Sequence, residues 1–215
     1  MFRVFIFSIL LIYKKIDIII MRLEQRSKVM SKRKIISIAG DLSSGKTTVT
    51  KLMQETLGYE IYRNGEYFRK LAAEKGMSVT EFNVYVKDHP EIDRQIEQSA
   101  KEYAATRENL IIDARLGWYA VPDSFKVYLR VDTDEAARRA FGDPNRKKTE
   151  NHASVEEQKA DMIRRFNLEN ERYFELYGVR KDDMSNYDFV LDTTELTPEE
   201  VNAKIIEAYE AWLSE

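Results

Sequence analysis

The residues best suited to chemistry form one short run, Gly40-Asp41-Leu42-Ser43-Ser44-Gly45-Lys46-Thr47-Thr48. Its glycines and its Lys-Thr pair match the pattern Gly-x-x-x-x-Gly-Lys-Thr, the phosphate-binding P-loop. Glycines let the backbone curl so that several N–H groups point into one concavity that binds an anion. Lys46 would then reach the β- and γ-phosphates of a nucleotide, and the Thr47 hydroxyl would bind Mg²⁺. The run therefore predicts a site for nucleotide phosphates and a magnesium ion.

A P-loop needs a strand before it and a helix after it. The apolar, β-branched segment 35–39 precedes the run, and the apolar residues after it recur at helical spacing: Val49, Leu52, Met53 and Leu57. The alternative is a chance match inside an ordinary strand, turn and helix. The setting favours the functional interpretation, because the helix adds its unpaired N-terminal donors to the loop.

The rest of the chain alternates between strand and helix patterns. We expect further strands at residues 59–62, 109–113, 125–131 and 187–191. Helix starts are indicated by capping boxes, prolines or single capping residues at Asn64, Ser78, Pro90, Asp132 or Asp134, Ser154 and Thr197. The helix from Ser154 should end at Leu176 or Tyr177, and a polar, basic loop covers residues 142–149. Such alternation predicts a single α/β domain with a parallel sheet covered on both faces.

Composition excludes several kinds of site. The 215 residues include no cysteine and only His89 and His152, so a disulfide framework, a thiolate zinc site and a serine–histidine triad are not expected. The net charge of −3 gives no argument for a nucleic acid polymer or a membrane surface as the main partner. We expect a cytoplasmic monomer.

Residues 1–30 differ in composition from the rest of the chain. Their apolar runs are interrupted by Lys14, Lys15 and Asp17, which would lie in the middle of a membrane span. We expect that translation begins at Met30 or Met21 and that residues 1–30 are not part of the working fold, with a membrane anchor as the alternative. The folded domain would then cover residues 31–215.

Two arginines follow predicted strands. Arg69 lies in the first turns of the helix after the strand at 59–62, and Arg115 comes just past Asp113, where the strand at 109–113 ends. Ligands of open α/β sheets bind outside the carboxyl ends of the strands. A guanidinium group suits a monophosphate, because it can donate two parallel hydrogen bonds. The alternative is a pair of surface arginines in ion pairs.

A third group of charged residues shares one helix face. Arg165, Glu169 and Arg172 are spaced i, i+4, i+7. The ordinary explanation is a solvated, self-paired charge stripe. Because Arg138 and Arg139 precede the basic loop, the loop could instead close over bound nucleotides and bring positive charge to a transferring phosphoryl group.

The order of these motifs resembles the compact cytidylate kinases of the P-loop nucleoside-monophosphate kinase family. The matching segments are residues 40–48, 65–69, 90–94, 113–118, 169–177 and 187–188. The sequence departs from the family in the loop interior, which lacks the usual proline and extra glycine, and at Ala114, where glycine is common.

The resemblance implies a five-stranded parallel sheet with an acceptor-binding helical region and a lid. It implies transfer of the γ-phosphoryl group of ATP to CMP or dCMP. Residues 40–48 would hold the ATP phosphates, with Thr47 on Mg²⁺. The remaining roles would fall to residues that bind the acceptor or line the transfer path: Arg69 and Arg115 on the monophosphate, Asp93 and Arg94 near cytosine or ribose, Asp113 on the metal's water shell or the acceptor, and Arg138 or Arg139 with Arg165 and Arg172 on the lid side. We also place Glu169, between these last two, in the acceptor site.

Two other functions fit the same motifs. One is a P-loop kinase for another small molecule, such as AMP or a coenzyme precursor. The other is a nucleotide-binding regulatory module without transferase activity, which would leave the arginines unexplained.

Overall fold

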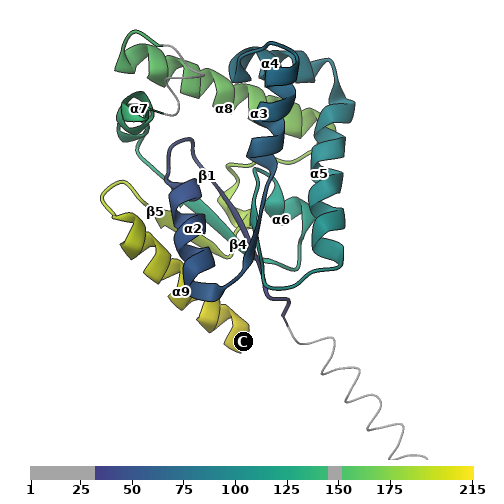
Figure 1. The fold of residues 1–215 in the computed structure, drawn as a ribbon, viewed down its shortest axis with the longest axis vertical. Coiled ribbons are helices and arrows are strands. Elements are labelled where there is room, and N and C mark those ends of the chain that lie inside the picture. The colour runs from purple at the N-terminus through teal and green to yellow at the C-terminus, as the bar shows by residue number, and fades with distance from the viewer. Residues whose placement is uncertain (1–31, 145–151) are drawn as a thin grey trace, which may run out of the picture. The chain divides into compact units, whose positions relative to one another are not determined.

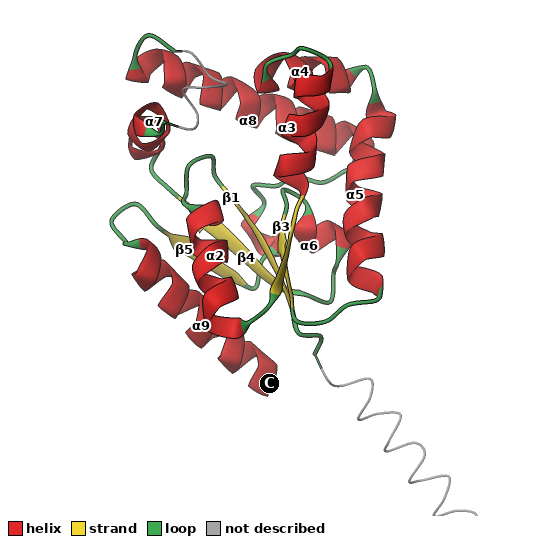
Figure 2. Ribbon diagram, viewed as in Figure 1, coloured by secondary structure: helices red, strands yellow, loops and turns green. Residues whose placement is uncertain are grey.

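Five parallel strands form the centre of the computed structural model, which describes residues 32–144 and 152–215. They are β1 (Ile35–Gly40), β2 (Glu60–Arg63), β3 (Leu110–Asp113), β4 (Phe125–Arg130) and β5 (Phe189–Asp192). Their order in the sheet is β2-β3-β1-β4-β5, as Figures 1 and 2 show. The predicted parallel α/β sheet is confirmed, and the P-loop strand β1 lies at its centre.

Helices cover both faces of the sheet. The helices with long described spans are α2 (Lys46–Leu57), α3 (Asn64–Glu74), α4 (Val79–Lys87), α5 (Pro90–Ala105), α7 (Thr133–Gly142), α8 (Val155–Tyr177) and α9 (Pro198–Ser214). Two short helical turns are also described, α6 (Gly117–Ala120) and the 3₁₀ turn η2 (Met184–Asn186). Helices α2 and α9 pack together on one face, while α5 and α6 lie on the other (Figure 1). Helices α3, α4 and α8 extend past the carboxyl ends of the strands, where a ligand of this kind of sheet binds.

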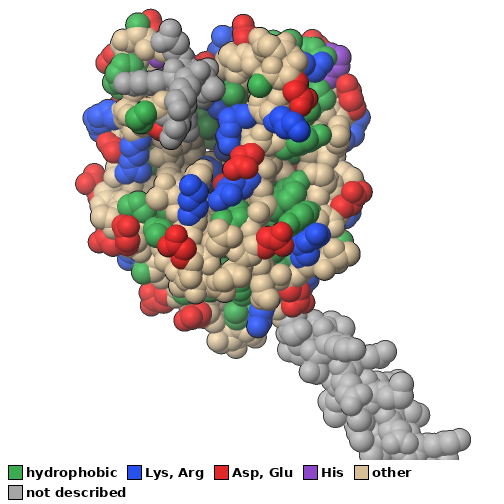
Figure 3. Space-filling view, in the orientation of Figure 1, with side chains coloured by type: hydrophobic (Ala, Val, Ile, Leu, Met, Phe, Trp, Pro, Cys, Tyr) green, Lys and Arg blue, Asp and Glu red, His purple; other side chains and the backbone are tan. Residues whose placement is uncertain are grey.

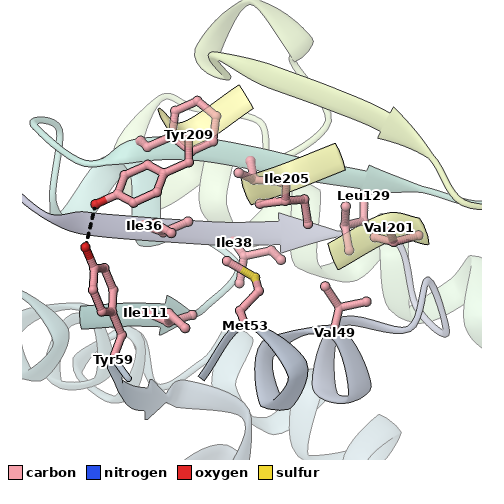
Figure 4. Packing of buried hydrophobic residues seen from close by; sticks show 12 residues of the cluster. Ile36, Ile38, Val49, Met53, Tyr59, Ile111, Leu129, Val201, Ile205 and Tyr209 are labelled. Carbon is pink, nitrogen blue, oxygen red and sulfur yellow. Dashed lines mark hydrogen bonds between the residues drawn. The ribbon is translucent and has the colours of Figure 1, made fainter. Parts of the chain in front are cut away.

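The hydrophobic core between β1 and α2 holds the two elements that flank the P-loop. Alternate residues of β1 point to opposite faces, as the two-residue period of a strand requires. Ile36 and Ile38 pack with Val49 and Met53 of α2, and the side chains of α9 close this cluster (Figure 4). Each of these four residues is at least 99% buried. Burying an aliphatic side chain stabilises a fold by about 1.5–3 kcal/mol, so β1 and α2 form a rigid support for the loop between them.

The structure corrects two predicted helix starts and adds one short helix that the sequence did not predict. Asn64 is the first residue of α3 rather than its cap, and Arg63 precedes the helix without a side-chain capping bond. Ser154 accepts a hydrogen bond from the Glu157 amide, but the Glu157 carboxylate accepts from the Ala153 amide instead of completing the box. Helix α6 has only four residues, too short to show a helical pattern in the sequence.

The prediction for residues 1–30 falls outside the described residues and stays a prediction, as does the proposed closure of the basic loop, most of which lies at 145–151. Internal contacts group residues 33–215 into one unit. Within the described ranges, we find no helix with the length and apolar character of a membrane span.

Candidate active site

The P-loop, residues Gly40–Thr48, turns sharply at both glycines. Gly40 has a φ of 151°, and a β-carbon added there would lie 2.4 Å from the Leu129 carbonyl oxygen on the neighbouring strand β4. Gly45 caps α2 with a φ of 88°, and a β-carbon added there meets no atom within 4 Å. Gly40 is therefore required by close packing, while Gly45 bends the chain beside open space, as a phosphate cradle needs.

The unusual interior of the loop is held by its own side chains. The Asp41 carboxylate accepts hydrogen bonds from the Tyr128 hydroxyl at 2.7 Å and from the Val131 amide at 3.0 Å. Leu42 is buried against α7 and α8. Ser43 stands in the stretch where the family has an extra glycine, and its φ is 61°, in the left-handed region. The side chains of Asp41 and Leu42 thus hold the loop in place, so any contact of these two residues with phosphate would come from the backbone.

Lys46 lies along the inside of the loop. Its Nζ donates to the carbonyl oxygens of Gly40 at 2.8 Å and Asp41 at 2.9 Å. Burial, assisted by the Arg115 charge, lowers the pKa of Lys46 to about 7. An anionic ligand would favour its charged form. Thr47 and Thr48 are exposed at the start of α2, so the Thr47 hydroxyl is accessible to a metal ion.

A second group of cations surrounds Asp113 at the end of β3. Burial raises the pKa of Asp113, and four nearby cations oppose the rise: Lys46, Arg115, Arg63 and Arg69. We call Arg63, Arg69 and Arg115 the acceptor cations, after the role that the resemblance implies for Arg69 and Arg115. Arg63 pairs in register with Asp113 across β2 and β3, with its Nε 4.0 Å from the Asp113 Oδ2. The two predicted arginines, Arg69 and Arg115, thus gather with the P-loop lysine around Asp113. Figure 3 shows Lys and Arg side chains gathered where the surface is hollowed between α7 and α3.

The three charged residues of α8 are buried rather than solvated. Arg165, Glu169 and Arg172 are each at most 5% exposed, so the interpretation as a solvated charge stripe is wrong. Glu169 Oε2 lies 2.8 Å from Arg115 Nε and also contacts Lys181 Nζ. Burial alone would raise the pKa of Glu169, but these cations hold it far below its ordinary value. Glu169 therefore carries a full negative charge that orients Arg115.

Arg172 links three helices. Its Nε lies 2.5 Å from Asp93 Oδ2 on α5, and its NH1 donates to the Asn83 Oδ1 on α4 at 3.0 Å. Both members of the Arg172–Asp93 pair are nearly inaccessible to solvent. The pair therefore fixes how α4, α5 and α8 meet around the acceptor cations.

Comparisons with known proteins agree with this geometry. The family model described as "AAA domain" matches residues 36–161. A Thermoplasma volcanium protein named cytidylate kinase is 35% identical over 176 residues, which cover 80% of this chain and 88% of that protein. An Archaeoglobus fulgidus protein of the same name is 34% identical, over 81% of this chain and 94% of that protein.

The chain belongs to the cytidylate kinase family. The resemblance seen in the sequence is confirmed, and so is the P-loop kinase fold. Among solved structures, the shikimate kinase from Bacteroides thetaiotaomicron superposes with a TM-score of 0.57 at 17% identity, over 82% of this chain and 98% of that one. That likeness shows the fold alone.

Other predicted residues of this cytidylate kinase family member lie apart from the acceptor cations. Arg138 is exposed and pairs with Glu135 at 3.0 Å. Arg139 also pairs with Glu135, and its NH2 donates to the carbonyl oxygen of Thr194 at 2.8 Å in the loop after β5. The structure thus places Arg139 against that loop. Arg94 is exposed on α5.

Sequence reasoning missed three residues of the site. Arg63 is the last residue of β2, at the edge of the sheet. The predicted strand ended one residue earlier, at residue 62, so the sequence did not place Arg63 at the carboxyl end of a strand. Lys181 is 97% buried beyond the end of α8, and burial lowers its pKa to about 8. Glu97 lies one turn after Asp93 on the same face of α5, a spacing visible in the sequence.

Proposed function

We propose that this protein transfers the γ-phosphoryl group of ATP to CMP or dCMP, giving ADP and the pyrimidine nucleoside diphosphate. The observation that carries the proposal is the pairing of two half-sites. The P-loop offers a cradle for a triphosphate, and three acceptor cations stand beside its lysine around Asp113. Membership of the cytidylate kinase family supports cytosine as the base of the acceptor.

The donor half-site fits ATP with Mg²⁺. The backbone N–H groups of residues 40–48 and the N-terminus of α2 would hold the β- and γ-phosphates, with Lys46 between them. The exposed Thr47 hydroxyl would bind Mg²⁺, which supplies charge neutralisation between the phosphates. Among the described residues, no group of three or more His, Cys, Asp or Glu side chains is placed to hold a metal. This fits an ion bound through one protein oxygen, phosphates and water.

The acceptor half-site fits a monophosphate. Arg115 and Arg69 would grip its oxygens, and Arg63 adds a third positive charge beside Asp113. A phosphate monoester is already largely anionic at neutral pH, so its oxygen can attack without a general base. The protein then contributes alignment of two anions and stabilisation of the charge that develops between them.

The helix α8 would complete the acceptor site. Glu169 holds Arg115, and Arg165 is buried on the same face one turn earlier. We keep a lid role for Arg165 and assign Arg172 to the support of the site, since it is paired with Asp93. A role for Arg138 or Arg139 in transfer stays a prediction that depends on the loop at 145–151. We also propose that the protein acts as a cytoplasmic monomer.

Acceptor-dependent ADP release tests the proposal. With ATP and Mg²⁺, we expect turnover with CMP and dCMP and little with AMP or with alcohols such as shikimate. Turnover with another acceptor alone would refute the choice of CMP. ATP binding without acceptor-dependent ADP release would favour a regulatory module.

Two variants test the half-sites separately. Lys46→Ala should abolish turnover while the protein stays folded. Arg115→Ala should raise the KM for CMP more than the KM for ATP. The matched control is Arg180→Ala, because Arg180 is exposed and its nearest charged partner is the neighbouring Asp182. Equal effects of the two arginine variants on the KM for CMP would refute the acceptor role of Arg115.

A further inference from the structure

Glu97 has a buried carboxyl group, and one of its two oxygens makes no hydrogen bond among the described residues. The residue is 8% exposed on α5. Within the described part of the chain, its Oε2 has no hydrogen-bond partner. An unpaired polar atom in a protein interior is costly, and native structures contain few of them. Glu97 therefore lacks the structural partner that would explain its place in the fold.

The surroundings of Glu97 are polar and aromatic. Glu97 interacts electrostatically with Asp93, one helical turn earlier, and with Arg172 across from it. Burial and then Glu97 raise the pKa of Tyr177 on α8. Among the described residues, the Tyr177 hydroxyl also has no hydrogen-bond partner. Two unsatisfied groups on facing helices indicate a space built for hydrogen bonds to something other than the protein.

A chain of contacts joins this space to the acceptor cations. Arg115 pairs with Glu169, and Glu169 interacts with both Asp93 and Arg172. Glu97 follows Asp93 by one turn of α5, about 6 Å along the helix axis at a rise of about 1.5 Å per residue. Glu97 is thus connected, through Asp93 and Glu169, with the arginine that would hold the monophosphate.

We propose that Glu97 reads the base of the acceptor, with Oε2 accepting a hydrogen bond from the exocyclic amino group of cytosine. The inference rests on the proposed function and adds the residue that determines its specificity. The carboxylates of Asp93 and Glu169 nearby favour a ligand N–H over a carbonyl oxygen. Uracil carries a carbonyl oxygen at the same ring position, and this oxygen would lie beside the negative charge of Asp93.

The protonation of Glu97 suits the same base. Burial, assisted by the Asp93 charge, raises the pKa of Glu97 to about 8, so the carboxyl group is largely neutral at pH 7. A neutral carboxyl group has an acceptor oxygen beside an O–H donor. Cytosine presents an amino donor beside the ring nitrogen N3, an acceptor, so the two edges are complementary.

The test combines variants of Glu97 with an acceptor that lacks the amino group. The second acceptor is the 5′-monophosphate of the pyrimidin-2-one ribonucleoside, which differs from CMP only at that position. Glu97→Met removes both polar atoms, whereas Glu97→Gln keeps an acceptor beside a donor. The matched control is Glu102→Met, because Glu102 is an exposed residue of the same helix.

We expect Glu97→Met to lower kcat/KM for CMP at least tenfold and to change kcat/KM for the analogue less than threefold. Glu97→Gln should stay within about threefold of the wild type with CMP. Glu97→Met should also melt no lower than the wild type, because it removes an unpaired buried group.

Three results would overturn the inference. One is an equal loss by Glu97→Met on both acceptors, which would indicate a structural role. Another is an unchanged kcat/KM with CMP. The third is a Glu97→Gln variant as impaired as Glu97→Met. A wild-type enzyme that phosphorylates only a different monophosphate would refute the proposed function itself, and the inference with it.

Discussion

Replacing Tyr128 by Phe removes one oxygen from the structure, and that oxygen holds the P-loop. Tyr128 lies in β4 and is 1% exposed, and its hydroxyl donates to Asp41 Oδ1 at 2.7 Å. Burial and the Asp41 charge raise the pKa of Tyr128 far above its ordinary value, so the phenol always remains a donor. The change leaves the aromatic packing intact and releases one of the two protein donors to Asp41.

The size of the effect follows from the charge of the acceptor. A hydrogen bond to a charged group contributes about 1.5–3 kcal/mol to the free energy of unfolding, against about 1 kcal/mol between neutral groups. We therefore expect Tyr128→Phe to destabilise the protein by about 2 kcal/mol. At about 2–4 °C per kcal/mol for a protein of this size, Tm should fall by about 4–8 °C. A looser loop should also raise the KM for ATP about three- to tenfold, which corresponds to about 0.7–1.4 kcal/mol of binding.

The assay compares this variant with a second Tyr→Phe change. Tyr59 is also buried, and its hydroxyl forms a neutral hydrogen bond of 3.1 Å with that of Tyr209, beneath α9 and away from the loop. Tyr59→Phe should cost about 1 kcal/mol and leave the KM for ATP unchanged. Thermal unfolding and steady-state kinetics with varied ATP give both quantities. A Tyr128→Phe variant with wild-type KM for ATP, or one no less stable than Tyr59→Phe, would refute the role of the Tyr128 hydroxyl in holding the P-loop.

Three further predictions concern single residues. Ser43→Gly should raise Tm by about 2–4 °C, because a non-glycine residue in the left-handed region costs about 1–2 kcal/mol of stability. Glycine removes this cost but loses more conformational entropy on folding, so the net gain is roughly 1 kcal/mol. A lower Tm would contradict this. ATP should raise the pKa of Lys46 above the value of about 7 that it has in the unliganded protein, so ATP binding at pH 8 should take up close to one proton and should weaken as pH rises above 7. Calorimetry in buffers of different ionisation enthalpy measures the proton uptake, and the absence of uptake would refute a contact between Lys46 and ATP. Asp93→Asn should destabilise the protein by about 3–5 kcal/mol in urea, because it leaves Arg172 buried without its counter-ion, whereas a loss below about 1 kcal/mol would show that the pair is dispensable.

The strands and the P-loop were predictable because their signals are local. The apolar run at 109–113 and the glycine spacing at 40–45 each fit a single element, and the structure confirms both. Arg69 and Arg115 were predictable by position, since each follows a strand and the carboxyl ends of parallel strands meet at one edge.

The burial of charged residues could not be predicted, because it depends on which helices meet. The spacing of Arg165, Glu169 and Arg172 predicted a shared face. It gave no sign that α4 would pack on this helix or that Asp93 of α5 would pair with Arg172. Lys181 enters the site through a fold-back after α8, fixed by a hydrogen bond from its amide to Asn170. Glu97 lacked any signal other than spacing, since an unpaired buried oxygen is visible only in three dimensions.

The central claim is that one protein aligns ATP with a cytidine monophosphate for direct transfer. Phosphorus-31 NMR of the protein with ATP, Mg²⁺ and CMP measures this directly, since it resolves every phosphorus species in the mixture. We expect the signals of CDP and ADP to grow in equal amounts and at the same rate, and to stay absent with Lys46→Ala. ADP and inorganic phosphate appearing without CDP would contradict the account.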